Sequence, residues 1–481
     1  KILSIPINSQ FKQFLTNVNN FIVYFLKIDQ TDHLKCIEII TNDNDKEKNI
    51  SSSLKNLTNE YQIKILYNLT LLLYNKSFFK SPDFISILET FTNPIIELEY
   101  PSKHFQNMYD LFISIQKSKP NKILFQISIF YSSKEGDDLK FYKNNIIQSI
   151  RISKQIQQLS NEKKEGKGIF SYCSSLYQVL FENPTSITLI GSYTFCNCKT
   201  LTKITIPSTV KTICEHAFYE CKQLQEIYFD SKSTLTEISS SSFSGCSSIS
   251  TISIPSTVCK IGSSAFTECT SLTNIIFEKP TTLKSIEKFT FSGCSSLKDI
   301  EIPSTVTSIG CLSFSRCSSL KQINIPSSVT IIELNSFLEC SSLTTISFEL
   351  PSSLISIGSK AFKSCCSLKE IKIPSSVSEI GNKIFSGCSS LYKISFDEPS
   401  NVKTIELNEF KEFNTLKEIY LPRSVESIGA KLFYECSSLT KITITSYVIS
   451  IEEYAFYKCS SLIEITISSS VISIGSHAFD K

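Results

Sequence analysis

Residues 297–317 read LKDIEIPSTVTSIGCLSFSRC, and close copies of this stretch recur along the chain. Its phenylalanine, Phe314, belongs to a series in which successive members are always 23 or 25 residues apart. Self-similarity at a fixed period is the sequence signature of a repeat architecture. The series contains Phe170, Phe195, Phe218, Phe243, Phe266, Phe291, Phe314, Phe337, Phe362, Phe385, Phe410, Phe433, Phe456 and Phe479.

Each part of the 297–317 unit predicts a local structure. Apolar and polar residues alternate up to Ile302, which predicts a short strand with one buried face, and Pro303-Ser304 predicts its end. Val306 and Ile309 predict a second short extended piece. Gly310 is interpreted as permitting a tight bend. Residues 313–317 predict one helical turn with its Phe and Cys three residues apart on the inner face.

A single coil of this kind cannot bury its own apolar edge, so neighbouring coils must stack into one continuous core. The expected fold is therefore a β-rich leucine-rich-repeat solenoid of irregular 23/25-residue coils with parallel strands. It covers residues 166–481 and contains about 13 coils, counted from the phenylalanine series. The two-residue insertions of the longer coils are expected in loops between strands, at residues 230–232, 278–280, 349–351 and 397–399.

The repeat also resembles a known family. Residues 258–269, VCKIGSSAFTEC, fit every fixed position of the second half of the pattern L-x-x-I-x-I-P-S-x-V-x-x-I-G-x-x-A-F-x-x-C. This pattern resembles the BspA-like leucine-rich repeats, in the form found in protists such as trichomonads and Entamoeba. The resemblance implies an irregular leucine-rich-repeat solenoid, a role in surface adhesion through binding of host or matrix proteins, and no enzyme activity.

Residues 1–165 lack the repeat, and we expect an all-α N-terminal domain there. Apolar residues recur at helical spacing between Phe11 and Leu26, and Ser81-Pro82-Asp83 has the composition of a helix start. The remaining helix candidates are residues 59–74, 103–116 and 138–159. Both ends of the chain, at Lys1 and Lys481, are expected to be truncated.

Twelve cysteines occupy one repeat position, three residues after the phenylalanine, where the coil of Phe410 instead carries Phe413. A position that accepts a bulky aromatic is interpreted as buried packing, where cysteine acts as a small hydrophobe. Parallel stacking points these side chains the same way, so disulfides between coils are not expected. A metal site is not expected either, because Cys196/Cys198 and Cys365/Cys366 are the only closely spaced pairs.

The sequence contains no candidate catalytic residue. None of its four histidines has metal or triad spacing, and no phosphate-binding or nucleophile motif is present. His216 and His477 stand where Ser, Lys and Tyr also occur, so we expect both in solvent. We accordingly predict no cofactor and no metal. A net charge of +3 favours neither nucleic acid nor an anionic membrane as partner. No apolar run is long enough for a membrane-inserted segment.

The outward positions of the main strand carry a mixed polar surface, which favours a protein ligand, whether a host, matrix or cellular protein. Tyr228 and Tyr420 are the expected anchors, because exposed aromatics favour interfaces. The alternative is a solvated face with no partner on these residues. The candidate binding residues are Glu226, Tyr228, Glu370, Lys372, Glu418 and Tyr420.

Three functions are weighed. The first is non-enzymatic protein recognition by a cell-surface or extracellular protein of adhesion type, and the second is a cytoplasmic scaffold or adaptor. The third, an enzyme with an accessory repeat domain, would need a catalytic site in residues 1–165, where none is visible. A reduced cysteine series fits a cytosol, although buried thiols also survive outside cells, so the compartment stays open. The ligand and the oligomeric state are not fixed by the sequence.

Overall fold

A computed structural model describes residues 147–152, 156–159, 168–402, 410 and 413–481, together with strands at 21–25, 37–41, 67–68, 95–100 and 126–131. The chain divides into two compact units. Unit 1 comprises residues 1–135, 144–157 and 173–186, and unit 2 comprises residues 136–143, 158–172 and 187–481.

Unit 1 contains two sheets. Strand β1 (Phe21–Phe25) pairs with β2 (Ile37–Thr41) in antiparallel fashion. A five-stranded parallel sheet has the order β3-β4-β5-β6-β8. Its strands are β3 (Tyr67–Asn68), β4 (Ile95–Tyr100), β5 (Gln126–Tyr131), β6 (Ile147–Ile152) and β8 (Gln178–Phe181).

These strands do not confirm an all-α N-terminal domain. Helices were expected over residues 11–26, 59–74 and 138–159, but the chain forms β1, β3 and β6 within these ranges. The segments FIVYF of β1 and IQSIRI of β6 are rich in β-branched and aromatic residues, which pack well on a pleated surface beside neighbouring strands. The helix candidates at residues 81–83 and 103–116 lie outside the described residues.

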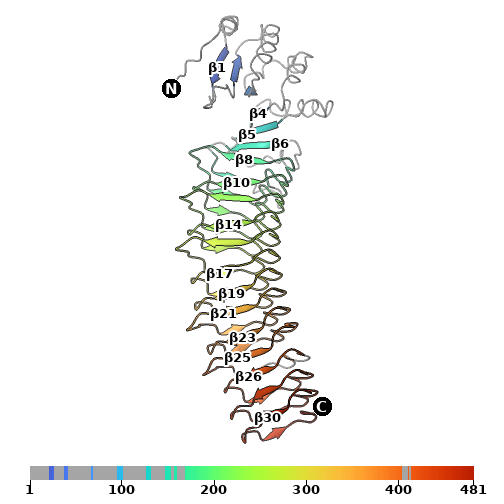
Figure 1. The fold of residues 1–481 in the computed structure, drawn as a ribbon. Helices are drawn as coiled ribbons and strands as arrows, with labels where there is room; N and C mark the ends of the chain where they lie inside the picture. Colours follow the sequence, from blue (N-terminus) through green and yellow to red (C-terminus); the bar gives the residue numbers. More distant parts are fainter. Residues whose placement is uncertain are drawn as a thin grey trace, which may run out of the picture. The chain divides into compact units, whose positions relative to one another are not determined.

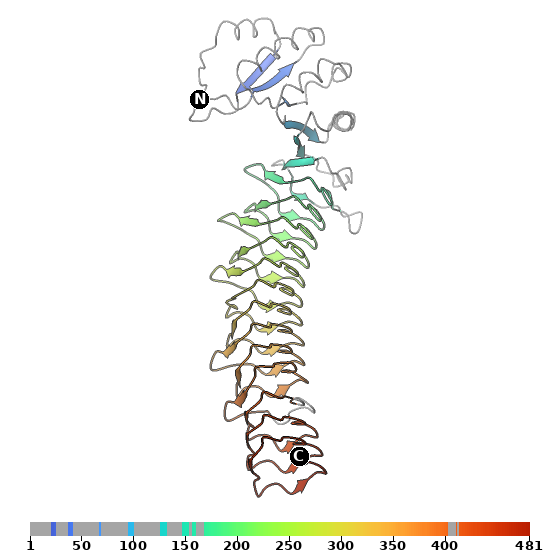
Figure 2. The same cartoon turned by 45° about the vertical axis from the view of Figure 1, so that its right-hand side comes forward.

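Unit 2 is a solenoid of about 12 turns, whose parallel strands form two stacks along its length (Figures 1 and 2). In the first stack, most strands have four residues with alternating exposed and buried side chains. We call these the main strands and their outward side the main-strand face. They are β10 (Lys203–Ile206), β12 (Glu226–Phe229), β14 (Thr251–Ile254), β16 (Asn274–Phe277), β19 (Gln322–Ile325), β21 (Thr345–Phe348), β23 (Glu370–Ile373), β25 (Lys393–Phe396), β26 (Glu418–Tyr420), β28 (Lys441–Thr443) and β30 (Glu464–Thr466).

The second stack consists of two-residue strands, whose outward side we call the short-strand face. These strands pair in parallel, in register, from one coil to the next. They are β7 (Gln158–Leu159), β9 (Leu189–Ile190), β11 (Thr212–Ile213), β13 (Glu237–Ile238), β15 (Lys260–Ile261), β17 (Ser285–Ile286), β18 (Ser308–Ile309), β20 (Ile331–Ile332), β22 (Ser356–Ile357), β24 (Glu379–Ile380), β27 (Ser427–Ile428), β29 (Ser450–Ile451) and β31 (Ser473–Ile474).

The coil that began the sequence analysis departs from its prediction. Residues 297–302 form no assigned strand, although Ile300 and Ile302 are buried and Asp299 and Glu301 are exposed, as a strand would place them. The insertions follow their prediction. Residues 230–232, 278–280 and 349–351 each lie between a main strand and the next short strand, as residues 230–232 lie between β12 and β13.

The third side of the coil, the turn face, is not the helical turn that the sequence suggested. Leu312 and Arg316 have φ values of 57° and 62°, in the left-handed region, and the backbone forms linked tight turns. These turns direct alternate N–H groups toward the next coil. The amide of Phe314 donates to the carbonyl of Ser336 at 2.8 Å, and the amide of Arg316 donates to that of Leu338 at 2.7 Å. A helix would instead use its N–H groups within its own chain segment.

Gly310 is required for close approach between coils, and no bend with a left-handed φ is involved. A Cβ at this position would lie 2.7 Å from the carbonyl carbon of Glu287 and from the amide nitrogen of Lys288 in the preceding coil. Gly262 and Gly358 have the same relation to the backbone of the coil before them. Glycine at this position therefore allows neighbouring backbones to pack in contact.

Phenylalanine and cysteine form two continuous series inside unit 2. Consecutive phenylalanine rings stack along the solenoid, with centroids 5.1–6.0 Å apart in the twelve stacked pairs between Phe170 and Phe479. Each ring of the series up to Phe456 is at most 2% exposed. The inward assignment of this series is confirmed.

The cysteine series is buried as predicted, but it does more than fill space. The thiol of Cys221 donates to the carbonyl of Phe195 at 3.1 Å, and Cys317 donates to Phe291 at 3.2 Å. The same bond to the phenylalanine of the preceding coil recurs for Cys198, Cys246, Cys269, Cys294, Cys340, Cys365, Cys388, Cys436 and Cys459. We call this the thiol ladder. Phe413, which has no thiol, packs edge-on against Phe410 at 6.3 Å.

Candidate protein-recognition face

The main-strand face displays large apolar side chains at a few positions in an otherwise polar surface. Tyr228 on β12 is 52% exposed and Ile276 on β16 is 51% exposed. Tyr420 on β26 is the third, at 37%. The strand pattern causes this exposure, because each lies between residues whose side chains face the core. These three side chains are the first candidates for contact with a partner.

The six binding residues expected from the sequence do not form one site. Glu226 and Tyr228 lie together on β12. The other four lie on β23 and β26, with β25 between these two strands. Residues 230–369, which include β14, β16, β19 and β21, separate the two groups along the solenoid. The structure therefore yields two candidate sites of different character.

The site around Tyr420 contains its own lysines. Lys393 on β25 is the register partner of both Glu370 and Glu418. Its Nζ lies 5.9 Å from the centroid of the Tyr420 ring. The hydroxyl of Tyr420 donates to Glu418 Oε2 at 3.1 Å. Lys372 forms an ion pair with Asp397, so two lysines lie among the three carboxylates of this site.

The site around Tyr228 holds carboxylates that are bound by neutral groups. The hydroxyl of Tyr228 interacts with the Glu226 carboxylate, which raises the pKa of Tyr228. On the next coil, the hydroxyl of Ser253 donates to Glu278 Oε1 at 3.0 Å. Glu278 and Ile276 were not among the residues selected from the sequence, and their grouping with Tyr228 depends on how successive coils align. The sequence signal that could have identified Ile276 is an isoleucine at an outward position of a main strand, where most coils carry a polar residue.

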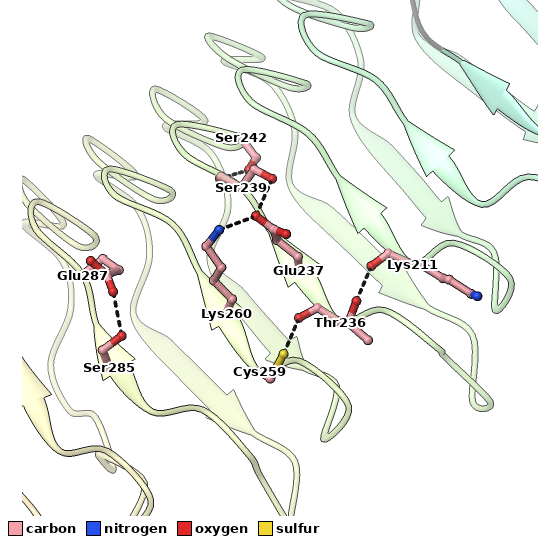
Figure 3. A network of polar contacts seen from close by, with 9 residues as sticks. All are labelled: Lys211, Thr236, Glu237, Ser239, Ser242, Cys259, Lys260, Ser285 and Glu287. Atoms are coloured by element: carbon pink, nitrogen blue, oxygen red, sulfur yellow. Dashed lines mark hydrogen bonds and ion pairs between the residues drawn. The ribbon is translucent and has the colours of Figure 1, made fainter.

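The short-strand face carries polar contacts that join neighbouring coils. Lys260 and Glu237, which are register partners, form an ion pair at 2.9 Å (Figure 3). The hydroxyl of Thr236 donates to the carbonyl of Lys211, and the thiol of Cys259 donates to that of Thr236 (Figure 3). This part of the face is therefore occupied by intramolecular bonds.

The expectation that His216 lies in solvent is wrong. Its ring is half-buried and stacks on Tyr193, with centroids 4.6 Å apart and ring planes 2° from parallel. Burial lowers the pKa of His216, and its Nδ1 has no hydrogen-bond partner. His477 is exposed, as expected, and its Nδ1 lies 2.6 Å from the Asp480 carboxylate.

The thiols show no arrangement for metal or disulfide chemistry within the part of the chain that is described. No group of three or more His, Cys, Asp or Glu side chains there has a metal-binding arrangement. None of the 17 described cysteines is in a disulfide. Desolvation raises the pKa of Cys340 to about 12, while Cys259 and Cys366 are exposed. A search of the described residues also found no helix long and apolar enough to cross a bilayer.

Comparison with known proteins assigns the repeats. Residues 163–282, 188–317, 277–392 and 390–481 match the BspA type leucine rich repeat region (6 copies). The chain belongs to the BspA-type leucine-rich repeat family. In this BspA-type protein the matched residues include the phenylalanine series, the thiol ladder and both candidate sites. The protist form of the repeat remains a prediction.

Solved structures similar to this BspA-type protein include three bacterial ones. A leucine-rich repeat protein from Bacteroides ovatus is 25% identical, with a TM-score of 0.47, and the match covers 67% of this chain and 84% of that one. A leucine rich cell surface protein from Faecalibacterium prausnitzii is 29% identical, with coverages of 59% and 84% and a TM-score of 0.36. The pneumococcal vaccine antigen PcpA is 20% identical, with coverages of 68% and 79% and a TM-score of 0.43. No curated protein matches the chain.

Proposed function

We propose that this protein is a non-enzymatic recognition protein of adhesion type, which binds a protein ligand at a cell surface through its main-strand face. The observation that carries the proposal is the exposure of Tyr228, Ile276 and Tyr420 on this face. Tyrosine is enriched at the energetic centres of protein interfaces, because it combines a large apolar ring with a hydrogen-bonding tip. Leucine-rich-repeat solenoids bind proteins on extended surfaces of this kind.

The composition of the face supports a protein ligand over a nucleic acid. Between Tyr228 and Ile276 the outward side chains are Thr251, Ser253 and Asn274, which carry no charge. A nucleic-acid site would require a continuous series of Lys and Arg along the face. The six residues expected from the sequence remain part of this proposal, as two separate contact points.

A second candidate function is a cytoplasmic scaffold, in which residues 1–165 and 166–481 each hold a partner. The absence of disulfides among the described cysteines favours it, because reducing compartments keep thiols unpaired. The two functions predict different locations. Antibodies against the solenoid should stain intact source cells if the surface proposal is right, whereas staining confined to permeabilised cells would exclude it.

A matched pair of variants tests the binding face. We expect the triple variant Tyr228→Ala/Ile276→Ser/Tyr420→Ala to lose partners that cross-link to the wild-type protein on source cells. The control variant, Ile331→Ser/Ile355→Ser/Tyr447→Ala, removes exposed apolar side chains outside the main strands. It should still cross-link to the same partners as the wild-type protein. Equal retention of partners by both variants would assign recognition to another face.

A further inference from the structure

The surface between Tyr228 and Ile276 has room for one side chain of a partner. Tyr228, Ser253 and Ile276 hold the same strand position on three consecutive coils, β12, β14 and β16. Ser253 is the register partner of Ile276, and β12 belongs to the coil before β14, so the small Ser253 lies between the two large side chains. Glu226, Tyr228, Ser253, Ile276 and Glu278 are defined here as the Tyr228 patch.

The Tyr228 patch has negative charge without an internal cation. Ser253 holds the Glu278 carboxylate at 3.0 Å, in the interval between Tyr228 and Ile276. The neighbouring Lys279 is occupied, because it forms an ion pair with Glu301 at 2.7 Å. Two other exposed lysines are near in sequence or register, Lys203 opposite Glu226 and Lys232 in the following loop, and neither forms an ion pair with a described carboxylate.

A second copy of the same constellation shows what such a patch accepts. The tripeptide Glu-Ile-Tyr occurs at residues 226–228 and again at 418–420, each time with a lysine as register partner of the glutamate. At the second copy, Lys393 Nζ lies 5.9 Å from the Tyr420 ring, where a cation is attracted by the ring face. At Tyr228 no lysine takes this position among the cation–ring contacts of the described residues.

We infer that the Tyr228 patch binds a lysine or arginine side chain of the protein partner, with an apolar residue beside it. The aliphatic stem lies between Tyr228 and Ile276, and the charged head reaches Glu278 and Glu226. Basic side chains bury their stems on apolar surface while the head stays on acceptors. The carboxylates of the patch are complementary in charge to such a head. This inference rests on the proposed function and specifies the chemistry of its partner.

A peptide-display experiment tests it. Random linear peptides are selected on the folded wild-type chain, and single peptides are then titrated against purified variants. We expect lysine or arginine next to an apolar residue to be enriched. Affinity should fall about tenfold or more for Tyr228→Ala and severalfold for Glu278→Gln and Ile276→Ser. It should also weaken as salt rises, because the contact pairs opposite charges.

The control is Tyr447→Ala, which removes an equally exposed tyrosine outside the main strands and should change affinity less than about twofold. Lys203→Ala removes a competing cation and should strengthen binding. Thermal melts establish that every variant folds, which is expected because each changed side chain is exposed. Enrichment of acidic or uncharged peptides, equal effects of Tyr228→Ala and Tyr447→Ala, or no selected peptide at all would overturn the inference. None of these outcomes tests the proposed function, which is tested by the cross-linking of whole-protein partners on source cells.

Discussion

At the scale of single residues, the cysteine of each repeat has a specific bond as well as a volume. A thiol is a weak donor, and in this solenoid it gives a second hydrogen bond to a phenylalanine carbonyl of the preceding coil, as Cys317 does to Phe291. The Phe291 carbonyl already accepts from the amide of Cys294 at 3.2 Å, so the thiol adds a bond between coils to a carbonyl that has two lone pairs. The repeat pattern predicted a small buried hydrophobe at this position but not its hydrogen bond.

Substitution of Cys317 separates these two roles. Cys317→Ala loses both the sulfur packing and the bond to the Phe291 carbonyl, and we expect about 1–2 kcal/mol of lost stability. Cys317→Ser keeps a donor, so it should be no worse than alanine in spite of its polarity. Urea denaturation of both variants measures the difference. A serine variant clearly less stable than the alanine variant would show that only apolar packing matters.

Phe314 and Tyr228 have opposite expected effects on stability. Phe314→Ala leaves a cavity in a continuous ring stack and should cost about 3–5 kcal/mol. Tyr228→Ala removes an exposed side chain and should change stability by less than about 0.5 kcal/mol. Thermal melts of the two variants check this contrast. Similar melting shifts for both would contradict the assigned core.

His216 predicts a specific dependence of stability on pH. Burial lowers its pKa below the ordinary value of 6.5, so at mildly acidic pH the unfolded chain takes up a proton that the folded chain refuses. The stability contributed by neutral His216 is complete above 6.5 and is lost as the pH falls toward the folded pKa. We expect the difference in Tm between about pH 8 and about pH 5.5 to shrink in His216→Phe.

At the scale of the element, the coil is built from three kinds of contact between neighbours. The main and short strands contribute parallel ladders, and the turn face contributes backbone bonds that need residues with positive φ, such as Leu312 and Arg316. Left-handed backbone costs about 1–2 kcal/mol for a residue with a Cβ. Each coil sustains this cost because its turn-face amides then reach carbonyls of the next coil.

Gly310→Ala tests the close approach of coils. The new Cβ would lie within 3 Å of backbone atoms of the preceding coil, so one backbone must shift, and we expect a loss of about 1–3 kcal/mol. Ser239→Ala is the matched control, because this position of another coil already has a Cβ. It should be close to neutral. The midpoints of urea denaturation of both variants measure the difference. An unchanged midpoint for Gly310→Ala would contradict the close approach of backbones at this position.

The sequence was sufficient for what depends on period. The spacing of the phenylalanines and the alternation in each strand predicted the parallel solenoid and the inward rings. It was insufficient where two structures share a spacing. A helical turn and the linked turns of the turn face both place Phe314 and Cys317 three residues apart, and they differ in the φ of Leu312 and Arg316. Likewise, Phe11 to Leu26 has helical spacing, although FIVYF within it forms a strand.

The candidate site shows the same limit. That Tyr228 faces outward followed from alternation within one strand and is confirmed by its exposure. The grouping of Tyr228 with Ile276 and Glu278 depends on contacts between coils, across insertions of two residues that shift the numbering. One-dimensional periodicity does not specify which side chain of a longer coil turns back onto its neighbour.

At the scale of the whole molecule, the thiol ladder reports on the integrity of the stack. Its thiols are buried, and desolvation raises the pKa of Cys340 among them, whereas Cys259 and Cys366 are exposed. We expect a maleimide at neutral pH to modify these two rapidly. The ladder cysteines should react only as fast as coils open, because the thiolate is the reactive form. Peptide mass spectrometry over a denaturant series measures this, and rapid labelling of Cys340 in buffer would contradict a closed stack.

The glycines at the coil contacts carry a consequence for how such a chain changes length. Gly262, Gly310 and Gly358 each lie against a preceding coil that has Ser239, Glu287 or Glu333 at the equivalent position. A coil of 25 residues and an adjacent coil of 23 residues together form a pair of 48 residues, and this pair can be duplicated or deleted as one unit. Unequal recombination that duplicates or deletes such a pair preserves the fit at both junctions. A crossover of one coil instead brings two side chains or two glycines together, and the chain already has both arrangements, at Cys214 with Ser239 and at Gly358 with Gly381.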